Sequence, residues 1–149
     1  MSNTSRTETL RAGEYYFGDI CYIMNEEVYH KVWGDKLGFK DGLFHVDFRD
    51  SQGRQWLGDF VVSGTAYGDG CYEGKHRNYG VDAGVLGLVP ISLWDPEKAK
   101  DIKRLGARFV ARSRVAFEVK DGWFTVDSEN FHECVDTDPK QEEDDRKED

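Results

Sequence analysis

The 149-residue chain contains only three cysteines, has no Cys-x-x-Cys pair and lacks any apolar run long enough to cross a bilayer. An odd number of cysteines is not typical of a disulfide framework, and the missing Cys-x-x-Cys spacing argues against a zinc knuckle. The four histidines show no metal-ligand spacing, so we expect no metal and no cofactor. Without a long apolar run, we expect no membrane partner.

Motifs of known catalytic mechanisms are also missing. The glycines form no phosphate-binding loop, because no Gly-Lys-Ser/Thr ending opens a helix. No Gly-x-Ser-x-Gly nucleophile elbow occurs. Cys71 and His76 are close enough in sequence to pair across a hairpin, but no local signature supports a nucleophile, and cysteine as core filler is the favoured interpretation. The sequence therefore leaves open whether the protein is an enzyme.

The length and the charge distribution predict one domain with polar ends. Residues 1–11 are polar and lack the apolar stretch of a signal peptide, so we expect a flexible N-terminus and a cytoplasmic location, cytosolic or nuclear. Residues 12–135 are expected to form a single β-rich domain. Residues 136–149 hold eight acids and three bases of a chain with net charge -9, and have no apolar side chain to bury. They predict a disordered acidic tail that solubilises the protein or, alternatively, contacts a basic partner.

Alternation of apolar and polar residues predicts antiparallel strands. Residues 43–49 place Phe44, Val46 and Phe48 on one face, and a turn then leads to a second strand over 54–62. This pattern is typical of a hairpin with one buried face.

A second alternating segment covers residues 107–120. The Asp121-Gly122 pair that follows is a strong two-residue turn signal, and it predicts a hairpin with a strand over 123–126. Antiparallel connections of this kind are typical of a meander, barrel or sandwich.

Two short helices are expected between the strands. Asn25 can cap a helix over 26–33, which carries an apolar stripe. Asp95 and the following proline begin a second helix over 96–105, which Gly106 ends. The predicted fold is therefore mainly β (α+β), an antiparallel β-barrel or sandwich with one or two short helices.

A five-residue segment occurs twice, as Gly-Asp-Ile-Cys-Tyr at 18–22 and Gly-Asp-Gly-Cys-Tyr at 68–72. Gly-Asp favours a bend, while cysteine and tyrosine rings favour the interior. We therefore expect two equivalent corners that converge with residues 81–84, with Cys21 and Cys71 buried and reduced. The stretch between and after the repeats is rich in glycine, which indicates tight packing or, alternatively, a ligand.

These motifs resemble those of a small β-rich domain family without an assigned function, found in phage, bacterial and protist proteins. The matching segments are Gly-Asp-x-Cys-Tyr at 18–22, Gly-Asp-Gly-x-Tyr at 68–72, and Val-Asp-Ala-Gly at 81–84 followed by Gly87 and Pro90. Ile20 stands where the family has proline. The resemblance implies one compact β-rich domain and no particular substrate.

The repeated motif and its surroundings supply the candidate ligand-binding residues. They are Asp19, Tyr22, Asp69, Tyr72, His76 and Asp82. The three aspartates would suit general acid–base chemistry if burial separates their pKa values. The favoured alternative is that each accepts hydrogen bonds from N–H groups of its own turn.

A basic stripe follows in the sequence. Residues 98–114 hold seven bases and one acid, and Arg108, Arg112 and Arg114 are expected on one exposed strand face. Such a stripe can track phosphates, although a solvated face is the favoured interpretation because the domain as a whole is acidic.

Three functions remain open for this protein of unknown function. The favoured one is a small soluble binding or interaction module without catalysis, whose partner is an unknown small ligand or a protein. The alternatives are a small hydrolase-like enzyme that uses Asp19, Asp69 and Asp82, and, least favoured, a nucleic-acid contact through residues 98–114. The oligomeric state does not follow from the sequence.

Overall fold

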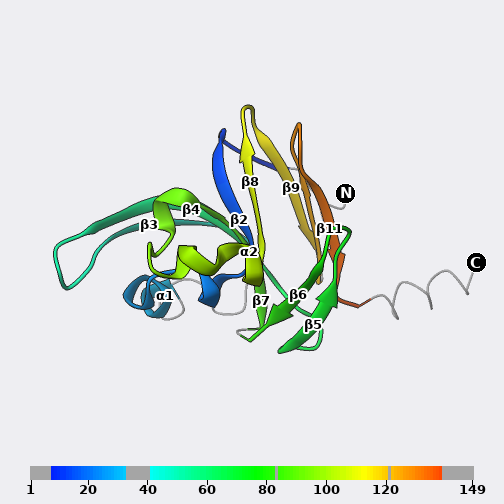
Figure 1. Cartoon of the computed structure of the whole chain (residues 1–149), viewed down its shortest axis with the longest axis horizontal. Coiled ribbons are helices and arrows are strands. Elements are labelled where there is room, and N and C mark those ends of the chain that lie inside the picture. Colours follow the sequence, from blue (N-terminus) through cyan, green and yellow to red (C-terminus); the bar gives the residue numbers. More distant parts are fainter. Residues whose placement is uncertain (1–7, 33–40, 83, 121, 139–149) are drawn as a thin grey trace, which may run out of the picture.

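The computed structural model of the chain describes residues 8–32, 41–82, 84–120 and 122–138 (Figure 1). Within them, every strand pairing is antiparallel, and the strands form three open sheets rather than a closed barrel. This confirms the predicted mainly β, antiparallel fold and decides in favour of packed sheets.

The largest sheet has five strands. In spatial order they are β3 (Gly42–Arg49), β4 (Gln55–Gly64), β7 (Val85–Pro90), β2 (Gly13–Asp19) and β8 (Ala107–Ala111). The predicted first hairpin is β3–β4, which projects from the rest of the molecule in Figure 1. Its faces are as predicted: Val46 is buried between the half-buried Phe44 and Phe48, while His45 and Asp47 are exposed.

Two smaller sheets complete the fold. The four-stranded sheet contains β1 (Glu8–Leu10), β9 (Val115–Lys120), β10 (Trp123–Asp127) and β11 (His132–Asp136), and the two-stranded sheet contains β5 (Gly70–Glu73) and β6 (Asn78–Val81). The predicted hairpin around Gly122 is β9–β10.

Three sequence-based boundaries need correction. Residues 8–10, placed in a flexible N-terminus, pair with β9 as strand β1. The alternating segment 107–120 is not one strand, because a turn at 112–114 carries the chain from the five-stranded to the four-stranded sheet. Thr137, assigned to the acidic tail, is buried and donates a hydrogen bond to the Gly122 carbonyl. The remainder of the predicted tail, 139–149, lies outside the described residues.

The helical segments are short. They are η1 (Ile20–Tyr22), α1 (Glu26–Val32), η3 (Ile91–Leu93), η4 (Lys98–Asp101) and α2 (Ile102–Leu105). Asn25 caps α1 as predicted, since its side-chain oxygen accepts from the Glu27 N–H at 2.9 Å. The expected last residue of that helix, Trp33, lies outside the described part. The second predicted helix forms as a 3-10 segment and a single α-turn that ends at Gly106.

No helix in the described residues is long and apolar enough to cross a membrane.

The five-stranded sheet separates two apolar cores and belongs to both. One core lies between it and the two smaller sheets, and the other lies between it and the helical segments (Figure 1). Strand β2 contributes Tyr15 and Phe17 to the first core and Tyr16 to the second. Because successive side chains point to opposite faces, such a strand is buried on both sides. The two cores share this layer, so the chain folds as a single domain.

Glycines in this framework make room for neighbouring side chains. A Cβ on Gly106 would lie 2.4 Å from the Tyr16 ring, and one on Gly74 would lie 2.7 Å from the Tyr79 ring. At Gly87 it would lie 2.2 Å from Ile20. At these positions the packing interpretation of the glycines is confirmed.

Asp50 organises the turn between β3 and β4. One carboxylate oxygen accepts from the Gln52 and Arg54 N–H groups, at 2.9 and 3.0 Å, and the other accepts from the indole N–H of Trp56 at 2.9 Å. These hydrogen bonds, the one from Trp56 first, lower the pKa of Asp50 below its ordinary value. Trp56 is almost fully buried, so the turn is tied to the core below it.

We predict that the Trp56 indole resonance reports the titration of Asp50. A depressed pKa in the folded state means that the contribution of Asp50 to stability is present above its unfolded pKa and is lost as the pH falls through the folded value. The indole N–H signal in an NMR titration should therefore shift with a midpoint below 3.8, the ordinary value for aspartate. The Trp94 indole donates to a backbone carbonyl and serves as the control that should not follow this titration. A midpoint at or above 3.8 would contradict the assignment.

Candidate functional site

The two copies of the repeated motif adopt different conformations. In the first, Asp19 ends β2 and caps the 3-10 segment η1. In the second, Gly68 has a positive φ of 73° in a turn, and the chain then enters β5. The prediction of two equivalent corners is therefore wrong, because the same positions form a helical turn in the first copy and the start of a strand in the second.

The three motif segments nevertheless meet in space. Asp19 accepts from the Cys21 N–H at 2.9 Å and from the Asp82 N–H at 2.5 Å, and the Tyr22 hydroxyl donates to the Asp82 carboxylate. Gly70 at the start of β5 pairs with the residue before Asp82. The expected convergence is thus present, and Asp19 is fully buried within it.

The side chains of this cluster hold the backbone of the neighbouring segments in place. Asp19 binds two backbone N–H groups: that of Cys21 belongs to its own turn, as the turn interpretation expected, and that of Asp82 comes from a distant segment. Burial, followed by the charge of Asp19, raises the pKa of the Cys21 thiol, which keeps it protonated and poorly nucleophilic. The hydrogen bond to Asp82 raises the pKa of the Tyr22 hydroxyl.

The predicted burial of the cysteines is wrong for Cys71, which is exposed, while Cys21 is half-buried. Strand β5 belongs to a two-stranded sheet of which only one face packs against the core. Tyr72 occupies the covered face, and its hydroxyl donates to the Gly68 carbonyl at 2.8 Å. Period-two alternation then turns its neighbours Cys71 and Glu73 to solvent. Within the described residues, none of the three cysteines forms a disulfide.

The remaining predicted residues serve the β5–β6 loop or face solvent. The His76 ring stacks on Phe131 with centroids 5.2 Å apart, and its Nε2 lies 2.5 Å from the His132 carbonyl oxygen. Asp69 is exposed and, among the described residues, makes no side-chain hydrogen bond.

Sequence reasoning missed the buried carboxylate of Glu133. It accepts from the Lys75 and His76 N–H groups, at 2.5 and 3.1 Å, and from the Tyr79 hydroxyl at 2.6 Å. Burial and this last hydrogen bond raise the pKa of Tyr79. A signal existed in the sequence, since alternation along β11 puts Glu133 on the same face as the buried Val135.

Two cations of the surrounding segments are also structural. The Arg77 guanidinium donates to the carbonyls of Lys103, Arg104 and Gly106 at 2.6–2.8 Å, and so binds the end of α2. Lys98 donates to the Cys21 and Met24 carbonyls, at 2.9 and 2.7 Å, at the end of η1.

The basic stripe is largely neutralised by acidic neighbours. Four of its seven bases form ion pairs: Lys98 with Glu26, Lys100 with Glu97, Arg104 with Asp101, and Arg108 with Glu14. Arg108, Arg112 and Arg114 are all exposed, as expected. They do not share one strand face, because Arg112 and Arg114 lie in the turn that links β8 to β9.

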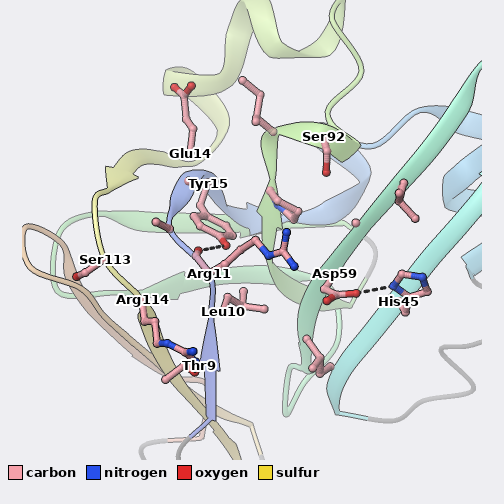
Figure 2. A pocket seen from close by; sticks show the side chains of 17 residues that line it. Thr9, Leu10, Arg11, Glu14, Tyr15, His45, Asp59, Ser92, Ser113 and Arg114 are labelled. Carbon is pink, nitrogen blue, oxygen red and sulfur yellow. Dashed lines mark hydrogen bonds and ion pairs between the residues drawn. The ribbon is translucent and has the colours of Figure 1, made fainter.

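A cavity of about 960 Å³ lies elsewhere, as an open groove (Figure 2). Its walls are the connection from β1 to β2, the outward face of the β3–β4 hairpin, the end of β7 with η3, and the β8–β9 turn. None of the six residues predicted from the sequence lines this groove. The predicted site and this groove are therefore different places.

The groove gathers exposed apolar side chains. Leu43, Leu57 and Ile91 line it and are 43%, 52% and 50% exposed. They are three of the five large apolar residues that the described part of the chain exposes. Gathering of this kind at one concave place is typical of a contact surface.

Polar groups converge on the same groove (Figure 2). His45 Nδ1 and Asp59 Oδ1 lie 2.6 Å apart on its β3–β4 wall. The Tyr15 hydroxyl donates to the Arg11 carbonyl at 2.6 Å on the opposite wall. Burial raises the pKa of Tyr15, the Arg11 guanidinium opposes this rise and the Asp59 carboxylate adds to it, so both charges act on the hydroxyl.

We predict that Asp19 matters for stability and Asp69 does not. Asp19→Ala leaves two backbone N–H groups without their acceptor in a buried place, which should lower the free energy of unfolding by about 2–4 kcal/mol. Asp69→Ala should change it by less than about 0.5 kcal/mol. Urea unfolding measures both, and similar losses in the two variants would refute the anchor role.

Glu133 should behave in the same way. Glu133→Ala removes the acceptor for the β5–β6 loop, and we expect a loss of about 2–4 kcal/mol in urea unfolding. Glu133→Gln keeps one oxygen acceptor and should be intermediate. Glu73→Ala, at an exposed position on β5, is the matched control. A loss in Glu73→Ala equal to that in Glu133→Ala would contradict the prediction.

Comparison with known proteins gives no assignment: the chain matches no protein-family model, no curated protein and no solved structure. The resemblance through the three short motifs therefore stays an expectation. The function has to be inferred from the groove itself.

Proposed function

We propose that the protein is a small binding module without catalysis that takes a small ligand in the groove beside the β3–β4 hairpin. The observation that carries this proposal is the gathering of Leu43, Leu57 and Ile91 in one concavity with convergent polar groups. A volume of about 960 Å³ falls at the upper end of the range for small-molecule sites. Such sites combine an apolar lining with a few polar groups that orient the ligand.

The apolar wall supplies affinity on this proposal. A ligand that covers the half-exposed Leu57 and Ile91 removes apolar surface from water, which contributes about 25 cal/mol per Å². The polar groups of the groove then select among apolar ligands, because an unmatched polar group would lose its contact with water.

The two alternatives draw less support from the site. The carboxylate of Asp19 is occupied by backbone N–H groups, and Asp69 is remote from any partner within the described residues. None of the three aspartates that this enzyme would use lines the groove. For the nucleic-acid alternative, phosphate groups would have to compete with the carboxylates that form four ion pairs with the basic stripe. Membership in the small β-rich family and a cytoplasmic location remain part of our proposal.

We predict that the neutral fluorescent probe N-phenyl-1-naphthylamine binds the groove. Leu57→Ser should weaken binding about five- to tenfold, as expected for losing a partly buried leucine contact. Val110→Ser is the matched control, because Val110 is also 52% exposed but lies on β8 outside the groove. Val110→Ser should leave the affinity within about twofold of the wild type. Equal affinities of the wild type and Leu57→Ser would contradict the proposed site.

A further inference from the structure

Two guanidinium groups in the groove lack an acidic partner. Arg11 and Arg114 both line it, and among the described residues no carboxylate oxygen lies within 4.0 Å of either. Arg114 donates to the Thr9 hydroxyl, at 3.1 Å. In Figure 2 the Arg11 side chain extends into the groove from the wall that carries Tyr15. By contrast, Arg104 and Arg108 nearby in the sequence are both ion-paired.

The acids of the groove are already occupied. Asp59 lies 2.6 Å from the His45 ring nitrogen, and Glu14 is paired with Arg108. Neither of these two acids therefore forms an ion pair with Arg11 or Arg114, and both guanidinium groups are available to an external anion. A guanidinium presents donors in a fixed fork that matches a carboxylate or a phosphate.

The charge lies next to the apolar wall. Arg11, Tyr15 and Asp59 all line the groove, and Figure 2 shows the Arg11 side chain extending toward the wall that carries Asp59. Asp59 is on β4, two residues after Leu57, and its partner His45 is two residues after Leu43 on β3. A ligand bound to Arg11 thus reaches the leucines of the hairpin directly.

We infer that the ligand is a small amphipathic anion. Its apolar body covers Leu43 and Leu57, and its carboxylate or phosphate group binds the Arg11 guanidinium. Arg114, on the β8–β9 turn, adds electrostatic attraction. This inference rests on the proposed binding function and adds the chemical class of the ligand. The two anionic groups share this recognition chemistry, and the experiment distinguishes them.

The test uses four ligands with the same octyl chain and the complete protein. Octanoate, octyl phosphate, octanol and octyltrimethylammonium compete, below their micellar concentrations and at low salt, with bound N-phenyl-1-naphthylamine. At least one of the two anions should bind about tenfold more tightly than octanol, as expected for a charge-assisted hydrogen bond. The cation should bind most weakly, and the tighter anion identifies the group that the site prefers.

Variants assign the preference to a residue. Arg11→Gln should reduce the affinity for the preferred anion about tenfold, to that of octanol, and leave octanol binding unchanged. Arg112→Gln is the matched control, since Arg112 is an exposed arginine beside the groove that does not line it. It should alter neither affinity.

The outcomes distinguish a failure of the anion inference from a failure of the proposed binding function. If octanol binds as tightly as both anions and binding still depends on Leu57, the anion inference is overturned and the binding function stands. If Arg11→Gln and Arg112→Gln weaken anion binding equally, the assignment to Arg11 is likewise overturned. If neither the probe nor any octyl compound binds, both proposals fail.

Discussion

The central strands of the five-stranded sheet are buried on both faces, and the rest of the molecule is arranged to make that burial possible. Strands β2, β4 and β7 send side chains into both cores. Where the chain leaves such a sheet, it is still in the interior of the protein, but its backbone N–H and carbonyl groups no longer pair with a neighbouring strand. Each of these groups therefore needs another hydrogen-bond partner. Charged side chains supply those partners at the points of exit.

This requirement accounts for the roles of four charged side chains. Asp19 and Glu133 bind N–H groups of loops, whereas Arg77 and Lys98 bind carbonyls at the ends of short helical segments. Each connects segments far apart in the chain, and a carboxylate or a cation can satisfy several backbone groups at once. Asp19 and Glu133 are buried, Arg77 and Lys98 are half-buried, and their contacts make all four parts of the scaffold.

The groove contains charged side chains that the scaffold does not use to bind backbone groups. The β1–β2 connection and the β3–β4 hairpin diverge there, and the outward face of the hairpin is left without a covering layer. Arg11 keeps its charge free of acids in the described part of the chain, and the leucines of the hairpin stay half-exposed beside it. The groove therefore differs from the buried carboxylates Asp19 and Glu133, because its arginine is not engaged by the scaffold and lies next to exposed apolar side chains. This difference makes the groove the candidate site.

The sequence by itself determined the features that depend on neighbouring residues. Alternation over 43–49 gave the faces of the first hairpin, the Asp-Gly pair at 121–122 gave the second, and Asn25 gave the start of α1, because turn, cap and pleat geometry are local. Only the tertiary structure decided that the chain changes sheets at 112–114, that Cys71 is exposed and that Glu133 is buried. Alternation records which residues share a face but not whether another layer covers that face. The groove was beyond prediction for the same reason, since its walls come from four separate parts of the chain whose meeting depends on how the sheets pack.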